Sequence, residues 1–458
     1  MSLHQNGLGL GRFVADSSFN IIRQIWMLLI NIAISIILVR SLGQEGRGFY
    51  TMAILLPDML YTFLNLGLGT AIVYFLGSQK HSVEEVIQEN IYVLSILTFF
   101  GVGIGFGIAY WAGDLLFPDI AKEYLLLGLL IYPLQLLTAF LVAIFQGKQD
   151  FRNYNLPTMV SGLMMLLLSV IFVWLMKLGI FGAILGNIIS KSTGLLFLII
   201  SIIKTYKPKL KLLSKIRYDS FKQFFRYGMT AQVANSIAYI NYRADYFLLN
   251  SIKGAASVGI YSVAVELAEK LWGPTSAITL VLLPRIASLE NNTDQQIQLT
   301  AFVSRVVVWV SLILTLVSLG FSELVIGYLY TDEFSGSILP FRIILLGIMS
   351  LNLTKLLGSD IAGRGKPEVN LKIALTAAIT NVTFNLILIP IWGIPGAAAS
   401  SSISYTVQTI ISLAWYHKTY QVPIRAFFIF TKADLIMLAD VSKRFLKKSL
   451  PRTDKLDI

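Results

Sequence analysis

The chain lacks cysteine altogether, and only 14% of its 458 residues are charged, compared with about 25% in an ordinary soluble domain. Without cysteine there is no disulfide framework, so a secreted disulfide-rich scaffold is excluded. Three histidines (His4, His81 and His417) leave little for a zinc or haem site, and no metal site is predicted. Because 55% of the residues are hydrophobic and the mean hydropathy is +0.71, polar groups could not cover a soluble fold of this length. The sequence therefore predicts a polytopic membrane protein.

Motifs that the chain lacks exclude further classes of function. The chain has no GxxxxGK[ST] phosphate loop, so a built-in ATPase is not expected. The opening MSLHQNGLGLGRFVADSS is polar and has no compact apolar core, so no cleavable signal peptide is expected. The longest predicted outer loop, residues 322–337, and the polar C-terminal tail are too short for a catalytic domain. An enzyme is therefore not predicted.

Long apolar runs make up most of the chain. A helix needs about 20 mostly apolar residues to cross the hydrocarbon core of a bilayer, and about twelve such runs occur. They cover residues 19–39, 49–76, 87–111, 123–146, 155–176, 179–203, 224–249, 257–283, 299–321, 338–360, 369–391 and 394–416. Because the runs are continuous and not alternating, they predict an all-α membrane protein instead of a barrel.

Lysine and arginine in the connections predict the orientation. If the N-terminus is cytoplasmic, the inside segments hold 23 basic residues and the outer loops hold five: Arg40, Arg47, Lys122, Lys177 and Lys253. By the positive-inside rule both termini are then cytoplasmic. The net charge of +12 is thereby explained as a topology signal, and nucleic-acid binding is not predicted. Within the tail, Pro423–Lys448 is predicted to form a basic amphipathic helix on the inner membrane surface.

Two halves of the chain resemble each other. Gly48–Ala53 (GFYTMA) matches Gly259–Ala264 (GIYSVA) at an offset of 211, and Gly179–Ala183 matches Gly393–Ala397 at 214. A repeat of six spans returns the chain to the same side, so the two copies are parallel and related by an axis along the membrane normal. The predicted organisation is an N-terminal six-helix lobe (1–203), a basic cytoplasmic linker (204–222), a C-terminal six-helix lobe (223–417) and a cytoplasmic tail (418–458).

Charges inside the predicted spans are the main functional signal. A charge near the bilayer centre costs at least about 2.5–3.5 kcal/mol, so such residues usually line a pathway or pair with one another. Basic residues near span ends, such as Arg305, can snorkel to the interface, whereas Lys191, Arg243 and Lys270 lie deeper. Helical spacing also places polar residues on one face of the first two spans in each predicted lobe. These polar faces predict a wet cavity between the lobes.

More basic than acidic residues lie within the spans, so this cavity is expected to attract anions. Arginine binds phosphate through paired donors, which suits a phosphate or diphosphate cargo. The predicted substrate-binding residues are Arg23, Asn31, Lys191, Arg243 and Lys270.

The acids within the spans have two open roles. They are Asp58, Asp245, Glu266 and Glu269, and Asp58 corresponds to Glu269 at the offset of 211. A carboxylate in such a cavity can carry a proton or sodium ion across, or it can permanently neutralise a buried cation such as Arg243 or Lys270. No cofactor other than a coupling proton or sodium ion is predicted.

Two sequence blocks resemble a known family. The first, Leu38–Phe75, carries an R-x-L-G-x-x-x-x-G-x-Y pattern at Arg40, Leu42, Gly43, Gly48 and Tyr50, and the second combines Arg243-x-Asp245 with Gly259-x-Tyr261. Both are similar to the polysaccharide flippases of the multidrug/oligosaccharidyl-lipid/polysaccharide transporter superfamily.

The resemblance implies a V-shaped transporter of about twelve helices in two lobes. It also implies transfer of undecaprenyl-diphosphate-linked oligosaccharide from the cytoplasmic to the outer leaflet of the bacterial inner membrane by alternating access. A polymerase and glycosyltransferases of the same pathway would be partners. Two alternatives stay open: an ion-coupled exporter of drugs or other small molecules, and a membrane-embedded enzyme of glycan assembly.

Overall fold

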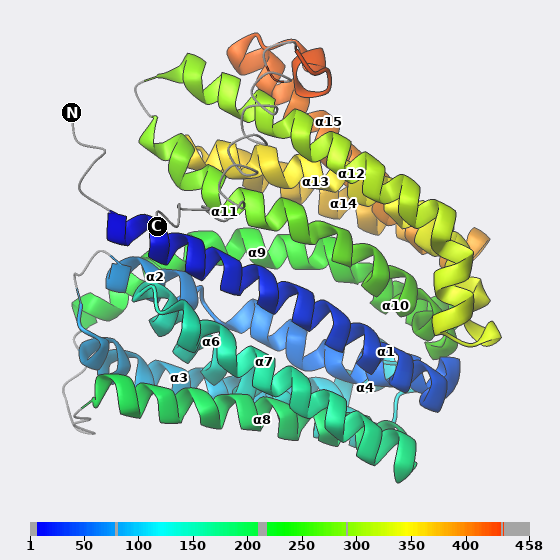
Figure 1. Ribbon diagram of the computed structural model, residues 1–458. Helices are drawn as coiled ribbons and strands as arrows, with labels where there is room; N and C mark the ends of the chain where they lie inside the picture. The colour runs from blue at the N-terminus through cyan, green and yellow to red at the C-terminus, as the bar shows by residue number, and fades with distance from the viewer. Residues whose placement is uncertain (1–6, 78–80, 209–217, 290–291, 432–433, 435–458) are drawn as a thin grey trace, which may run out of the picture.

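The computed structural model describes residues 7–77, 81–208, 218–289, 292–431 and 434, and these residues form helices joined by short turns (Figure 1). The N-terminal half contains α1 (Gly7–Leu64), α2 (Leu68–Gly77), α3 (Val83–Gly107), η1 (Ile108–Ala112), α4 (Gly113–Leu116), α5 (Lys122–Leu129), α6 (Ile131–Gly147), α7 (Phe151–Leu168), η2 (Ser169–Leu175) and α8 (Gly179–Tyr206). The C-terminal half contains α9 (Tyr218–Lys253), α10 (Ala255–Glu269), η3 (Lys270–Trp272), α11 (Gly273–Ser288), α12 (Thr293–Leu329), η4 (Asp332–Ser337), α13 (Ile338–Gly363), α14 (Pro367–Trp392), α15 (Ile394–Tyr420) and η5 (Ile424–Phe427).

These helices form twelve membrane-length segments, six in each half, and confirm the predicted all-α fold. Eight helices in the described part of the chain are both long and apolar enough to cross a membrane. One of these eight, Trp26–Leu64, contains a sharp break and so holds parts of two segments. The remaining segments, such as α9 and α15, are long enough but more polar. Each predicted span falls on one segment, although helix ends extend further, as in α12 (Thr293–Leu329) against the predicted 299–321.

Gly43 makes the break inside α1. Its backbone has φ of 67° and ψ of −174°, a conformation that glycine adopts readily because it has no Cβ. The helix resumes directly after it and the chain turns back (Figure 1). The prediction that Arg47 lies in an outer loop is therefore wrong: one glycine replaces the loop, and Arg47 lies in the first turns of the returning helix, 7% exposed.

The two lobes meet where α10 packs along α1, and this contact is made twice by equivalent residues. A Cβ on Gly48 would lie 1.8 Å from the carbonyl oxygen of Ala255, and a Cβ on Gly259 would lie 2.0 Å from the carbonyl oxygen of Gln44. At the offset of 211, Gln44 corresponds to Ala255 and Gly48 to Gly259. The predicted parallel repeat is thus visible as a reciprocal helix crossing at the lobe interface.

A second pair of contacts follows the same repeat. The Tyr50 hydroxyl accepts a hydrogen bond from Asn187 at 3.0 Å. The equivalent Tyr261 hydroxyl donates to Asp245 at 2.5 Å, and Ser401, at the offset of 214 from Asn187, donates to the same carboxylate at 3.1 Å. Each lobe therefore uses its G-x-Y tyrosine to tie its second helical segment to its own interior.

Further contacts close the lobes at the end of the bundle that carries Gly43. Arg40 donates to the carbonyl oxygens of Tyr328 and Leu329 at 2.9 and 3.0 Å, at the end of α12. Gln44 donates to the carbonyl oxygen of Glu333 in η4. Arg40, predicted to be an outer-loop residue, is exposed and joins the two lobes.

The linker and tail lie partly outside the described residues. α8 ends at Tyr206 and α9 begins at Tyr218, with 209–217 not described. Most of the predicted tail helix Pro423–Lys448 likewise lies outside the described residues, and its described start is the 3-10 turn Ile424–Phe427, so the expectation of an α-helix there is wrong.

Arg305 holds this described part of the tail against α12. Its guanidinium donates to the carbonyl oxygen of Ala426 at 2.6 Å and pairs with Asp434 at 2.8 Å, both side chains being 8% exposed. Trp309, one turn further along α12, donates to the carbonyl oxygen of Phe428 at 3.0 Å. The prediction that Arg305 snorkels is therefore wrong, because the returning tail brings acceptors to it.

Candidate functional site

A polar cavity of about 210 Å³ lies between the lobes. Its lining comes from α1, α9 and α10: Arg47, Tyr50, Thr51, Ile54, Leu55, Asp58, Arg243, Tyr246, Ser262, Glu266 and Glu269. These are the second segment of the N-terminal lobe and the first two segments of the C-terminal lobe. The cavity lies between the lobes, as the polar faces of the sequence predict, although no described side chain of the predicted first span (19–39) is among its lining residues.

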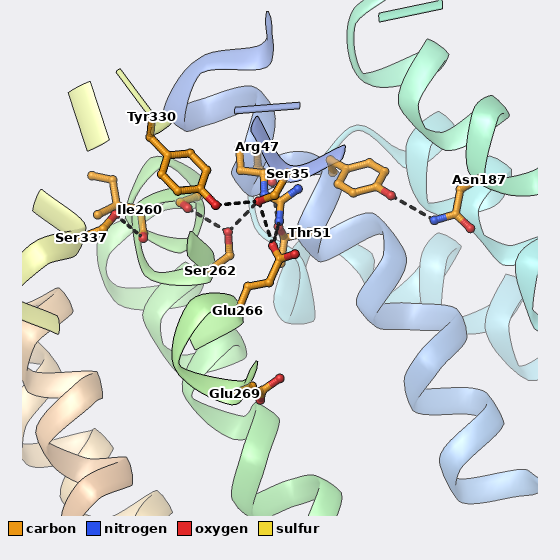
Figure 2. Close-up of polar contacts among 12 residues, drawn as sticks. Ser35, Arg47, Thr51, Asn187, Ile260, Ser262, Glu266, Glu269, Tyr330 and Ser337 are labelled. Atoms are coloured by element: carbon orange, nitrogen blue, oxygen red, sulfur yellow. Dashed lines mark hydrogen bonds and ion pairs between the residues drawn. The ribbon is translucent and has the colours of Figure 1, made fainter. Parts of the chain in front are cut away.

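One wall of the cavity is a hydrogen-bonded cluster that crosses the lobe interface (Figure 2). Arg47 pairs with Glu266 at 2.7 Å and donates to Ser262 at 3.3 Å. Ser35 donates to the same Glu266 carboxylate oxygen at 3.1 Å, and Tyr330 donates to Ser35 at 3.3 Å. The charges and hydroxyls of α1, α10 and Tyr330, the residue that follows α12, therefore bind one another and hold the two lobes together at this level.

Arg243 forms the second ion pair of the cavity, inside the C-terminal lobe. Its two terminal nitrogens lie 2.8 and 3.2 Å from the two carboxylate oxygens of Glu269. Its guanidinium carbon lies 5.5 Å from the centroid of the Tyr246 ring. The Arg243 and Glu269 side chains are 28% and 21% exposed, so the pair remains accessible from the cavity.

Asp58 faces the cavity from the N-terminal lobe. Gln135 of α6 donates to its carboxylate at 2.5 Å, and the charges of Lys191 and Arg243 act on it. Asp58 and Glu269 are equivalent in the repeat and line the same cavity from opposite lobes. The correspondence seen in the sequence thus places two carboxylates at one site.

The structure brings together only part of the predicted site. Of the predicted substrate-binding residues, Arg243 lines the cavity. Lys191 is half-buried on α8 and its charge acts on Asp58, but it is not among the lining residues, and Lys270 is half-buried in η3. Asn31 is half-buried on α1. The side chain of Arg23 lies outside those that the structure describes.

The predicted acids separate into two groups. Asp58, Glu266 and Glu269 line the cavity. Asp245 is 2% exposed and accepts hydrogen bonds from Tyr261 and Ser401, and the charge of Arg243 acts on it without an ion-pair contact. Its partners in the described structure are hydroxyls and its own backbone region, so its role is to join helices of the C-terminal lobe.

The charge of the cavity differs from the prediction. Among the described side chains, the lining holds two arginines and three carboxylates. The expected excess of basic groups is therefore wrong for the cavity as it stands. Counting charges along spans could not show that the deep lysines lie outside the lining, nor that each arginine is already paired with a glutamate of α10.

Sequence reasoning missed two cations near the site. Arg47 was assigned to a loop, although it directly precedes the repeated Gly48 and faces a span that carries Glu266. Lys355 of α13 has its ammonium 3.6 Å from the centroid of the Trp272 ring, and the charge of Glu269 acts on it. Its place inside the predicted span 338–360 was the available signal.

Comparison with known proteins places the chain in a family. The family described as polysaccharide biosynthesis protein matches residues 13–290. A protein of Shigella flexneri named as an O-antigen transporter is 24% identical over 83% of this chain and 91% of its own length. The capsular polysaccharide biosynthesis protein CapF of Staphylococcus aureus is 23% identical over 88% and 99%, respectively. The inward closed structure of the lipid II flippase MurJ has the same fold, with a TM-score of 0.72 at 17% identity, over 97% of this chain and 94% of that one. The chain belongs to the polysaccharide biosynthesis protein family of multi-pass membrane proteins.

Proposed function

We propose that this protein is a flippase that moves undecaprenyl-diphosphate-linked oligosaccharide from the cytoplasmic to the outer leaflet of the bacterial inner membrane, with both termini in the cytoplasm. The proposal rests on the position of Arg243. Its guanidinium offers two parallel N–H donors in a cavity lined by polar residues between two membrane-embedded lobes. A guanidinium there matches the geometry of a phosphoryl group. The named O-antigen and capsular polysaccharide relatives agree with a glycan cargo.

Movement of the lobes is needed for this cargo. A cavity of about 210 Å³ is smaller than the roughly 300–1,000 Å³ of ordinary small-molecule sites. The Gly48 and Gly259 crossings and the Arg47–Glu266 pair hold the lobes together at the end that the topology prediction places outside. We propose that cargo enters from the opposite end, with the lipid tail left in the bilayer between the lobes, and that the contacts exchange during transport.

Replacing Arg243 tests this proposal. In proteoliposomes loaded with labelled lipid-linked oligosaccharide, Arg243→Ala is expected to lower cargo affinity about 10- to 150-fold, because a charged hydrogen bond contributes about 1.5–3 kcal/mol. Arg243→Lys keeps the charge but loses the paired donors, so it should retain part of the activity. Exposure of the glycan to a lectin outside the vesicles measures the transfer. Lys372→Ala, at an exposed position of α14, is the control, and wild-type transfer by Arg243→Ala would refute the proposal.

Asp58 is the carboxylate that we propose for ion coupling. Its hydrogen-bond partner in the described structure is the neutral amide of Gln135, whereas Glu266 and Glu269 are held by arginines. A carboxylate in this setting can exchange a proton or a sodium ion as access changes sides. Asp58→Asn is expected to bind cargo normally while its flipping no longer responds to a proton or sodium gradient. A full response of Asp58→Asn to both gradients would remove Asp58 from this role.

The excess of carboxylates favours one other function, an ion-coupled exporter of small cationic molecules. Two of the three carboxylates are neutralised by Arg47 and Arg243, which leaves Asp58 as the acid such a cargo would meet. The same two variants separate these functions. A cation exporter should be disabled by Asp58→Asn and nearly unaffected by Arg243→Ala, whereas a glycan-lipid flippase should lose cargo binding with Arg243→Ala.

A further inference from the structure

The Arg243–Glu269 pair occupies the donors that an anionic cargo would need. Both terminal nitrogens of Arg243 contact the two oxygens of Glu269, at 2.8 and 3.2 Å. A carboxylate and a phosphoryl group present similar oxygen pairs to a guanidinium. A phosphoryl group therefore cannot take the same two donors until Glu269 has left them.

The pair is placed so that it can open without separating the lobes. Arg243 and Glu269 both belong to the C-terminal lobe and are 28% and 21% exposed to the cavity. Glu266 is held differently, because it accepts hydrogen bonds from Arg47 and from Ser35 of the other lobe. Glu269 is the last residue of α10, where the helix changes to the 3-10 turn Lys270–Trp272, and such changes within a long helix often mark a hinge.

Lys355 is a second cation that the Glu269 carboxylate could pair with after leaving Arg243. The Lys355 ammonium lies against the Trp272 ring, 3.6 Å from its centroid, and the charge of Glu269 acts on it. No carboxylate of the described residues lies within ion-pair distance of Lys355. Leaving one charge of this partly buried pair without a partner is unfavourable, so an exchange of partners is favoured over simple release.

We propose that Glu269 substitutes for the phosphate of the cargo in the empty transporter, and that a diphosphate displaces it from Arg243 onto Lys355. The inference rests on the proposed function, because it takes the cargo to carry a diphosphate. Glu269 then acts as a positioning residue: it keeps Arg243 neutralised and oriented while the cavity is empty, and it competes with the cargo for the same donors.

Competition predicts that the protein binds a diphosphate more tightly when Glu269 loses its charge. A structural or coupling role of Glu269 does not predict tighter binding. With purified full-length protein in detergent, Glu269→Gln removes the competing charge and is expected to bind undecaprenyl diphosphate and inorganic pyrophosphate at least tenfold more tightly than the unmodified chain. Lys355→Met is expected to weaken binding several-fold in the unmodified chain and to have no effect in the Glu269→Gln background, because the displaced carboxylate is then absent. Glu323→Gln is the matched control, since that exposed carboxylate pairs with Arg342 and neither residue is in the cavity lining.

The outcomes separate this inference from the proposed function. If the unmodified chain binds neither probe, or Arg243→Ala binds as tightly as the unmodified chain, the proposed diphosphate site itself fails. If Arg243→Ala loses binding but Glu269→Gln binds equally or more weakly, the displacement is refuted while the Arg243 site stands. A gain for undecaprenyl diphosphate without a gain for pyrophosphate would assign the effect to the lipid tail and would also refute it.

Discussion

Gly48→Ala is expected to prevent the two lobes from closing at the Gly43 end and to stop transport. The added Cβ would lie 1.8 Å from the carbonyl oxygen of Ala255, and backbone on both sides leaves no flexible side chain to move away. Overpacking of a tight contact costs about 1–3 kcal/mol, which corresponds to a shift of about 5- to 150-fold in the closed-to-open ratio. Gly259→Ala should have the same effect, because its Cβ would meet the carbonyl oxygen of Gln44 at 2.0 Å.

The rate at which a thiol in the cavity is labelled from outside measures this change in the closed-to-open ratio. Because the chain has no cysteine, Thr51→Cys introduces one thiol into the cavity lining. A membrane-impermeant maleimide added outside intact cells should label it slowly in the otherwise unmodified chain and faster with Gly48→Ala. Gly103→Ala is the control, since its Cβ would meet no atom within 4 Å. Unchanged labelling and transport in Gly48→Ala would show that the crossing does not govern closure.

Arg47→Ala is expected to destabilise the closed protein more than any other single loss of charge at the cavity. Removing one partner of a buried ion pair costs about 3–5 kcal/mol because the other charge is left uncompensated. The Arg47 and Glu266 side chains are 9% and 27% exposed, so partial hydration of Glu266 places the effect near the lower end of that range. Thermal unfolding in detergent measures the loss, and thiol labelling at Thr51→Cys measures the opening that accompanies it.

A double substitution distinguishes the ion pair from simple packing. Arg47→Ala with Glu266→Ala removes both charges, so it should be more stable than Arg47→Ala alone. If the double variant is instead destabilised by the sum of the two single effects, the two residues do not interact energetically.

The sequence predicted the helices and the repeat well because both depend on periodic, local signals. Twelve apolar runs marked twelve segments, and two short matches at nearly one offset identified residues that make equivalent contacts. The polar stretch Arg40–Arg47 predicts a break between the first two spans, but it does not show that the chain turns at Gly43 alone and is helical on both sides of it. That one error hid Arg47, and with it the cross-lobe ion pair.

The charge pairing inside the cavity was harder to predict than the position of the cavity. Helical spacing identified the faces that carry Asp58, Arg243 and Glu269, and the structure places these residues in one lining. Spacing does not specify which neighbour each charge faces, so it could not predict the pairing of Arg243 with Glu269 or the absence of Lys270 from the lining. The family-like motif shows the same limit: Gly43 and Gly48 serve the turn and the lobe contact and do not line the cavity.

The reciprocal crossing at Gly48 and Gly259 has the geometry of an isologous dimer interface, in which residue i meets j and j meets i. Here both partners belong to one polypeptide, as expected if a six-helix ancestor that associated with itself was duplicated and fused. The residues equivalent to Arg47 and Glu266 are Val258 and Leu55, so the ion pair has no symmetric copy. Shape complementarity is thus common to both halves, whereas the ion pair occurs once, an asymmetry that two identical subunits related by a two-fold axis could not have.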